Sequence, residues 1–326
     1  MNDVISISCA SDEAYYCGLL VTMHSLCTSA ASGSRLKIHV LDCGLEPASR
    51  EDFVKRLVSI PDREVDVQFH VADISCFSAF PKWRGGYAAY ARLALQDILV
   101  DEEWTIYTDI DTLWLRDVGE LWAEREHVLV LAAVPDGSGL PDLSSGMRTA
   151  ELFSARGRAI DPAKYFCSGL ILMNLSELRK RNFLAECARF LNGNLDLLDF
   201  PDQNLYNWIF PHPDTLMLDW RWGEFAAAYG KREMLSPRVI HYAKAAPWKK
   251  SISAVNVLWW NYVRTHLANT VLGFYARWKC FVYSFLRTRV GFNLVYGVAA
   301  LLNKKVYWKK KIAIYPNLVC NENRHL

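Results

Sequence analysis

One third of the way along the chain, an apolar run ends in two carboxylates: Trp104-Thr105-Ile106-Tyr107-Thr108-Asp109-Ile110-Asp111. The apolar residues Trp104–Tyr107 predict a buried strand. Side chains two positions apart in an extended segment project the same way, so Asp109 and Asp111 are expected to face a common ligand. Paired carboxylates repel each other without a cation, and their oxygens suit a divalent metal. An isolated Asp-x-Asp is more often a solvated turn, but open α/β sheets bind ligands directly after a strand, so both interpretations stay open here.

The residues around this stretch alternate between strand-like and helix-like runs, which is typical of a mostly parallel sheet covered by helices. The predicted strands are Val4–Ala10, Leu36–Leu41, Val65–Val71, Trp104–Tyr107, Val128–Val134, Gly169–Leu175 and Val239–Tyr242. The predicted helices are Tyr15–Thr28, Pro47–Val58, Tyr90–Leu99, Ser176–Leu191 and a short one beginning near Asp202, followed by segments around 255–267, 272–287 and 292–303. This order predicts an α/β, Rossmann-like fold with a mixed, mostly parallel sheet and a helical C-terminal segment.

The formal net charge of +2 conceals two opposite parts. Residues 1–248 contain 24 Lys and Arg against 34 Asp and Glu, whereas residues 249–326 contain 13 against 1. The second part also holds 14 of the chain's aromatic side chains. We therefore predict two domains, an acidic α/β domain over 1–248 and a basic, aromatic helical tail over 249–326.

The cysteines and the apolar runs indicate the compartment. Nine cysteines with no Cys-x-x-Cys pair are expected to be reduced, and the first residues lack a basic region followed by an apolar core. The C-terminal uncharged run Val290–Asn303 has 14 residues, short of the roughly 20 that cross a bilayer. We expect a cytoplasmic protein without a transmembrane helix.

Two enzyme classes that bind phosphate are disfavoured. Phosphotransferases of the haloacid-dehalogenase type place Asp-x-Asp-x-Thr/Val after their first strand, but here the fifth residue is Leu113 and the motif lies a hundred residues into the chain. No P-loop is present, and no Gly-x-Gly-x-x-Gly follows a strand.

Six motifs in one order resemble those of the family 8 glycosyltransferases, retaining enzymes with the GT-A fold that include lipopolysaccharide galactosyl- and glucosyltransferases. The resemblance covers roughly residues 4–248. The motifs are Ala10-Ser11-Asp12-Glu13-Ala14-Tyr15, Tyr90-Ala91-Arg92-Leu93, Asp109-Ile110-Asp111, Tyr165-Phe166-Cys167-Ser168-Gly169, Asp202-Gln203-Asn204-Leu205, and His241-Tyr242 with Pro247-Trp248.

The resemblance implies a role for each motif in binding a nucleotide-sugar donor. It implies that Asp109, Asp111 and His241 hold a divalent metal, Mn²⁺ in preference to Mg²⁺, which neutralises the departing diphosphate. Asp12 and Tyr15 would hold the uridine, with Ile110 and Arg92 also beside the donor and Asp136 near the sugar hydroxyls. Gln203 would stabilise oxocarbenium charge in a front-face transfer, and Asp202 would orient the sugar. The diphosphate would meet a lysine, either Lys244 or Lys249.

Each of these residues also has a purely structural interpretation. His241 alone would be a structural histidine, Arg92 a solvated helix residue, Asp136 a turn residue and Asp202 a helix cap. The motif order favours the functional roles. The chain departs from the family pattern at Cys167, which stands where the family has Asn, and in the lysine loop after His241, which is one residue shorter.

Two further segments suggest interactions. Residues 81–87, Pro-Lys-Trp-Arg-Gly-Gly-Tyr, could form a lid that excludes water or a plain surface loop. The basic, aromatic tail suits the headgroup layer of an anionic membrane better than a nucleic acid, because its aromatic residues recur at helical spacing. A packed helical subdomain is the structural alternative.

Together these observations predict a metal-dependent, retaining hexosyltransferase. It would move galactose or glucose from a UDP-sugar to a membrane-linked glycan such as a lipopolysaccharide core, as a peripheral protein on the inner face of the plasma membrane. The alternative is a non-catalytic binder of nucleotide-sugars or carbohydrates on the same fold.

Overall fold

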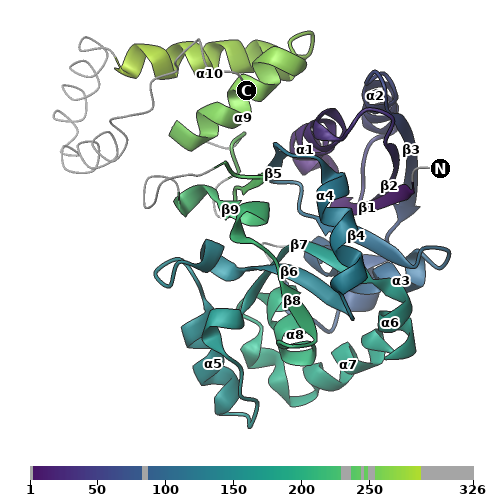
Figure 1. The fold of residues 1–326 in the computed structure, drawn as a ribbon, viewed down its shortest axis with the longest axis vertical. Coiled ribbons are helices and arrows are strands. Elements are labelled where there is room, and N and C mark those ends of the chain that lie inside the picture. The colour runs from purple at the N-terminus through teal and green to yellow at the C-terminus, as the bar shows by residue number, and fades with distance from the viewer. Residues whose placement is uncertain (1–2, 83–86, 229–235, 244–245, 249–253, 288–326) are drawn as a thin grey trace. The chain divides into compact units, whose positions relative to one another are not determined.

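The computed structural model describes residues 3–82, 87–228, 236–243, 246–248 and 254–287 (Figure 1). Its backbone contacts divide the chain into two compact units. The first unit comprises Met1–Ala228 and Leu235–Lys244, and the second comprises Tyr229–Met234 and Ala245–Leu326. The domain boundary after residue 248 stays a prediction.

A seven-stranded sheet forms the centre of the first unit, in the order β3-β2-β1-β4-β7-β6-β8. Its strands are β1 (Val4–Ser11), β2 (Arg35–Asp42), β3 (Glu64–Val71), β4 (Trp104–Thr108), β6 (Leu131–Pro135), β7 (Phe166–Asn174) and β8 (Thr215–Met217). The pairs β1–β2, β2–β3, β1–β4 and β6–β8 are parallel, whereas β7 runs antiparallel to both β4 and β6. The predicted mixed, mostly parallel sheet is confirmed.

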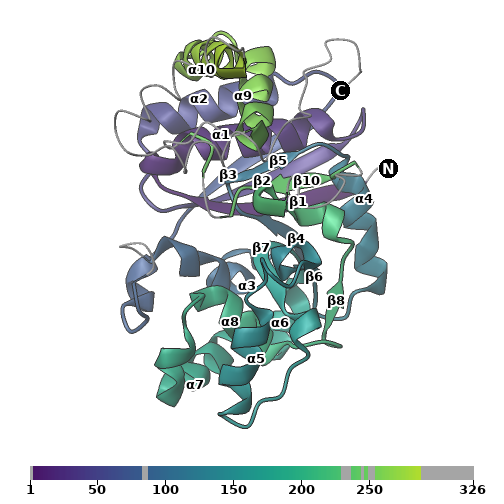
Figure 2. The same ribbon diagram turned by 90° about the vertical axis from the view of Figure 1, so that its left-hand side faces the viewer.

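Helices cover both faces of this sheet. Figure 2 shows α1 (Tyr16–Ser29) and α2 (Pro47–Val58) on one face, and α3 (Leu95–Ile98), α6 (Leu175–Lys180) and α8 (Pro201–Ile209) on the other. Among the described residues, the other α-helices of the unit are α4 (Val118–Ala123), α5 (Gly146–Ser154) and α7 (Phe183–Asn194). Proline at the first position of α2 fits the helix start, where its missing N–H costs no hydrogen bond.

A second, three-stranded sheet begins directly after the carboxylate motif, so that Asp109–Asp111 connects β4 of the main sheet to this smaller sheet. Its order is β5 (Thr112–Trp114), β10 (Val239–His241) and β9 (Glu224–Phe225). Buried hydroxyls of α1 hold β5 in place: Thr22 Oγ1 donates to the Thr112 carbonyl at 2.8 Å, and Ser25 Oγ accepts from Trp114 N at 3.1 Å. The small sheet is thereby fixed against the first helix.

Several predicted elements differ in detail. The predicted helix Tyr90–Leu99 is a 3₁₀ helix, Ala88–Ala94, followed by the short α3. The predicted helix Ser176–Leu191 is interrupted at Asn182, whose backbone is left-handed at φ 52°, so that α6 and α7 are separate helices. The α5 helix was not predicted, because its sequence continues a stretch rich in Gly, Pro and Ser.

The second unit contains α9 (Ala254–His266) and α10 (Val271–Arg287), close to two of the predicted tail helices. Trp259, Trp260 and Val263 of α9 are buried. Gly273, in the first turn of α10, lies close to the residue that follows α9: an added Cβ there would lie 2.3 Å from the Leu267 carbonyl oxygen. None of the described helices combines the length and the apolar character needed to cross a membrane. The predicted segment 292–303 lies outside the described residues.

Candidate metal and donor site

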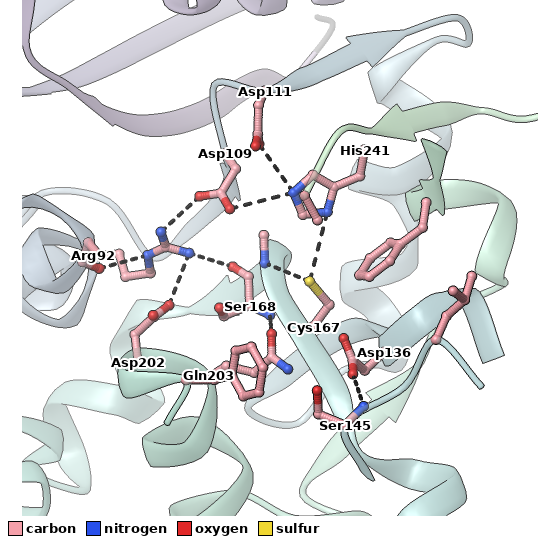
Figure 3. Close-up of a pocket in the computed structure, with 16 residues that line it drawn as sticks. Arg92, Asp109, Asp111, Asp136, Ser145, Cys167, Ser168, Asp202, Gln203 and His241 are labelled. Atoms are coloured by element: carbon pink, nitrogen blue, oxygen red, sulfur yellow. Dashed lines mark hydrogen bonds and ion pairs between the residues drawn. The ribbon is translucent and has the colours of Figure 1, made fainter. Parts of the chain in front are cut away.

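Asp109, Asp111 and His241 converge at the carboxyl edge of β4 (Figure 3). Each offers one ligand atom, and the three atoms lie within 4.8 Å of one another. His241 Nε2 is 3.2 Å from Asp111 Oδ1 and 3.7 Å from Asp109 Oδ2. The structure thus brings together the three residues that the sequence predicted as metal ligands, although His241 is 130 positions beyond Asp111.

The backbone explains this convergence. Asp109 N donates to the Gly169 carbonyl of β7 at 2.7 Å, and Tyr242 N donates to the Asp111 carbonyl at 2.9 Å. His241 pairs with Thr112 in the antiparallel β5–β10 ladder, which sets it beside Asp111. The two carboxylates therefore lie on a turn that is held at both ends by other strands.

The electrostatics of the three residues indicate a place for a cation. Burial raises the pKa of Asp109, the Arg92 guanidinium opposes this, and Asp111 adds to the rise, with a raised pKa as the net result. Burial lowers the pKa of His241, but the Asp111 carboxylate and, to a smaller extent, Cys167 together raise it well above its ordinary value. A divalent ion at this place would relieve the repulsion between the two carboxylates.

Gly169 leaves the space that such an ion needs. A Cβ at this position would lie 2.3 Å from His241 Cε1 and 2.9 Å from Asp109 Oδ2. Any other residue would push the imidazole or the carboxylate out of place. Two carboxylates, one imidazole and this small cradle fit a divalent metal with oxygen and nitrogen ligands.

Arg92 lies at the centre of a buried charge cluster beside the metal ligands. Its Nη2 is 2.8 Å from Asp109 Oδ1, and its Nη1 is 3.1 Å from Asp202 Oδ2 and 2.9 Å from the Ser168 carbonyl. Its guanidinium also lies over the Tyr107 ring, 4.4 Å from the centroid. Arg92 therefore orients two acidic side chains, and its predicted contact with the diphosphate stays a prediction.

The metal-ligand candidates and Arg92 line a cavity, and the remaining predicted sugar-binding residues line it too. Asp202 and Gln203 lie in the first turn of α8, and Gln203 Oε1 accepts a hydrogen bond from Ser168 N at 3.3 Å. Asp136 is buried and accepts from Ser145 N at 2.7 Å. The backbone after Asp136 turns through Gly137 at φ 62°, where a Cβ would lie 2.4 Å from Ser144 N. This turn holds Asp136 at the wall of the cavity.

A second cavity adjoins the first and shares Arg92, Asp109 and Asp111 with it. Asp12, Tyr15 and Ile110 line it, as predicted residues of the donor site. The Asp12 carboxylate caps a 3₁₀ turn by accepting from Tyr15 N at 3.2 Å. The two cavities therefore meet at the carboxylate motif.

Three sequence predictions fall outside the described residues: Lys244, Lys249 and the central part of the lid segment, residues 83–86. Other residues of the site were not predicted from the sequence. Phe225 packs edge-on against the His241 ring, with centroids 5.3 Å apart, and Gly169 forms the cradle. Nothing in the sequence around Phe225 indicated this contact, whereas Gly169 ends the motif Tyr165-Phe166-Cys167-Ser168-Gly169.

Comparisons with known proteins agree with this geometry. The model of the family described as Glycosyl transferase family 8 matches residues 6–251. General stress protein A of Bacillus subtilis is 28% identical over 225 residues, which cover 64% of this chain and 71% of that protein. Glycosyltransferase GlyA of Streptococcus pneumoniae is 23% identical over 79% of this chain, which spans 34% of the GlyA sequence.

Solved structures show the same fold. The galactosyltransferase LgtC, crystallised in complex with donor and acceptor sugar analogs, aligns over 81% of this chain and 95% of its own, with a TM-score of 0.67 and 22% identity. The bifunctional glycosyltransferase WbbM aligns over 86% of this chain and 52% of its own, with a TM-score of 0.64 and 18% identity. The architecture is therefore that of the GT-A fold.

Proposed function

The chain belongs to glycosyltransferase family 8, and from this premise we propose that it transfers galactose or glucose from a UDP-sugar, with retained configuration, to a membrane-linked glycan such as a lipopolysaccharide core. The observation that carries the proposal is the convergence of Asp109, Asp111 and His241 beside the sugar-site residues Asp202 and Gln203 in one cavity. A non-catalytic binder would need the cavity but not this set of ligands.

Asp109, Asp111 and His241 would hold the cation, with Mn²⁺ as the proposed ion and Mg²⁺ as the alternative. When bound, the cation would stabilise the negative charge that develops on the departing UDP. Asp12, Tyr15 and Ile110 line the adjoining cavity, which supports its assignment to the nucleotide.

Gln203 and Asp202 would act on the donor sugar. An amide is a poor nucleophile, so we propose that the acceptor attacks from the face that UDP leaves, while the Gln203 side chain stabilises the oxocarbenium charge. The leaving phosphate oxygen would take the acceptor's proton. Asp202 would orient the sugar, and its ion pair with Arg92 holds that carboxylate in one position.

The tail would bring the enzyme to its lipid-linked acceptor, at the inner face of the plasma membrane. One side of α10 carries apolar side chains that are each more than half exposed: Val271, Phe274, Tyr275, Trp278 and Phe281. Arg277 and Lys279 lie on the same helix, and the segment after it is rich in lysine. This combination supports a helix that lies in the headgroup layer of an anionic membrane.

Donor turnover tests the enzymatic proposal. UDP release from UDP-galactose and UDP-glucose is measured with and without Mn²⁺, for the wild type and for Asp111→Asn. We expect release from at least one donor that depends on Mn²⁺ and is lost in the variant. UDP-sugar binding without any release would favour the non-catalytic alternative, and release that does not need a metal would contradict the proposed site.

A further inference from the structure

His241 presents its two ring nitrogens to different surroundings. Nε2 faces the carboxylates of Asp109 and Asp111, whereas Nδ1 lies 3.8 Å from the sulfur of Cys167. The imidazole is also confined by the Phe225 ring and by Gly169. Cys167 itself is 6% exposed, and its sulfur accepts a hydrogen bond from Gly169 N at 3.4 Å.

The proton on the far nitrogen decides whether His241 can bind a metal. A neutral imidazole that offers Nε2 to a cation carries its proton on Nδ1 and donates it to a neighbour. In most metal sites that neighbour is a carboxylate, a backbone carbonyl or water. Among the described residues, the group facing Nδ1 at hydrogen-bond distance is the Cys167 sulfur.

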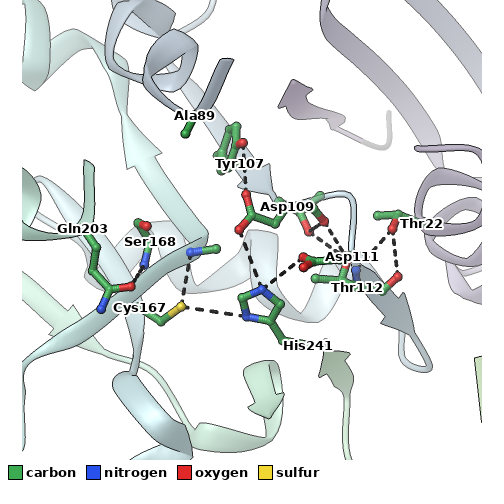
Figure 4. Close-up of polar contacts among 12 residues, drawn as sticks. Thr22, Ala89, Tyr107, Asp109, Asp111, Thr112, Cys167, Ser168, Gln203 and His241 are labelled. Atoms are coloured by element: carbon green, nitrogen blue, oxygen red, sulfur yellow. Dashed lines mark hydrogen bonds and ion pairs between the residues drawn. The ribbon is translucent and has the colours of Figure 1, made fainter. Parts of the chain in front are cut away.

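Cys167 is not placed to be a ligand. Its sulfur lies on the side of the ring opposite the carboxylates, and the group of atoms that could share one ion consists of Asp109, Asp111 and His241 (Figure 4). Cys167 also lines the cavity that Asp202 and Gln203 line, but only 6% of the residue is exposed there. Its position behind the imidazole leaves it to act on a metal only through His241.

We propose that Cys167 is a positioning residue of the metal centre: its sulfur accepts the Nδ1 proton of His241 and so keeps Nε2 directed at the cation. This inference rests on the proposed function, because it assumes that the site binds a divalent ion. It also gives a role to the position at which this chain departs from the family's asparagine.

Metal binding measured apart from turnover tests the inference. Free Mn²⁺ is quantified by its electron paramagnetic resonance signal as the protein is titrated in the presence of UDP. Cys167→Ala and Cys167→Val remove the acceptor and are expected to raise the Kd for Mn²⁺ about tenfold. Cys167→Ser keeps an acceptor of similar size and is expected to recover at least part of that loss.

A buried thiol far from the site serves as the matched control. Cys187 of α7 is 1% exposed, so Cys187→Ala reproduces the loss of a buried sulfur without touching His241. Its Mn²⁺ affinity is expected to equal that of the wild type. If Cys167→Ala does not fold, Cys167→Val replaces it, because valine fills the space of the thiol.

The outcomes distinguish a failure of the proposed role of Cys167 from a failure of the proposed metal-dependent function. If the wild type binds Mn²⁺ and the alanine, valine and serine variants bind it equally well, the inference is wrong and the proposed function stands. The same holds if only the KM for the sugar donor changes, because Cys167 would then contact the sugar directly. If the wild type binds no Mn²⁺ in the presence of UDP, the metal-dependent function fails, and the inference fails with it.

Discussion

Arg92 Nη1 lies 3.1 Å from Asp202 Oδ2, with 7% and 9% of the two side chains exposed. The ion pair joins the 3₁₀ helix before α3 to the first turn of α8, two segments that are 110 residues apart in the sequence. Burial alone would lower the pKa of Arg92, but Asp109 and Asp202 more than compensate and raise it well above its ordinary value. The guanidinium is thus a permanent cation between the metal site and the sugar site.

Replacing this cation is expected to cost both stability and activity. Arg92→Met leaves the buried Asp202 carboxylate and the partly buried Asp109 carboxylate without their partner, and breaking a buried ion pair typically costs about 3–5 kcal/mol. Urea denaturation should show a loss of this size. Arg92→Met combined with Asp202→Asn should lose less than the single variant, because one uncompensated charge is gone. If the two losses simply add, the ion pair does not couple the two residues.

A methyl group at Gly169 is expected to damage the metal site with little effect on the main sheet. Gly169→Ala places Cβ 2.3 Å from His241 Cε1, so the imidazole must move away from the carboxylates. We expect the Kd for Mn²⁺ to rise by about tenfold or more, as when the groups that orient a metal ligand are lost. Calorimetric titration with Mn²⁺ in the presence of UDP measures this change.

Gly223→Ala is the matched control, because Gly223 is buried and the three atoms nearest its added Cβ would be Val134 side-chain atoms, at 3.2–3.3 Å. Its melting temperature can fall, but its Mn²⁺ affinity should remain that of the wild type. Equal metal affinity in both variants would show that Gly169 does not form the cradle.

The sequence predicted the class of the fold and the residues that the structure brings together at the site, but not the direction of each strand. Asp109, Asp111 and His241 belong to motifs whose chemistry is visible in residue types, and the structure brings them together. The direction of β7 is a different matter. Phe166–Met173 is buried throughout and mostly apolar, and a strand buried on both faces has the same sequence pattern whether its neighbours are parallel or antiparallel.

Short elements escaped prediction for a related reason. β5, β8 and β9 have three residues or fewer, too short to show a period. β5 is held by buried hydroxyl groups of α1, a tertiary effect that no local pattern reports. Phe225 likewise reaches His241 through the pairing of β9 with β10.

A histidine remote from the site should make stability depend on pH. His39 of β2 is 2% exposed. Its Nδ1 lies 3.0 Å from His70 Nε2, and its Nε2 lies 3.4 Å from Glu102 Oε1. Burial is the main cause that lowers the pKa of His39, to about 4. The pKa of His39 in the folded protein lies below its unfolded value of about 6.5. The contribution of neutral His39 to the free energy of unfolding is therefore complete above pH 6.5 and is lost as the pH falls towards 4. The loss over this range should be about 2–3 kcal/mol.

Urea denaturation between pH 7.5 and 4.5 measures this slope, and His39→Gln isolates it. The variant cannot take up the proton, so the difference in unfolding free energy between variant and wild type should shift as the pH falls. His127→Gln, at an exposed position, is the control and should leave the slope unchanged. A difference between His39→Gln and wild type that is constant across the range would contradict the assignment.

The exposed side of α10 should determine membrane binding. Phe274, Trp278 and Phe281 are 65%, 53% and 69% exposed, and each ring that settles at the interface contributes about 1 kcal/mol if roughly half of its surface leaves water. Replacing all three with serine should therefore weaken partitioning onto vesicles rich in phosphatidylglycerol by about a hundredfold. Sedimentation of the full chain with these vesicles measures the change.

Two comparisons distinguish binding through the apolar side of α10 from non-specific hydrophobic adsorption and from purely electrostatic binding. Val58, Val71 and Leu129 are also exposed, and replacing these three with serine should leave vesicle binding unchanged. Raising the salt concentration should weaken the binding of the wild type, because the basic residues act through screened attraction, while the effect of the three aromatic residues should persist. If the α10 variant binds as tightly as the wild type at every salt concentration, the apolar side of α10 does not enter the headgroup layer, and the membrane proposal loses the observation that supports it.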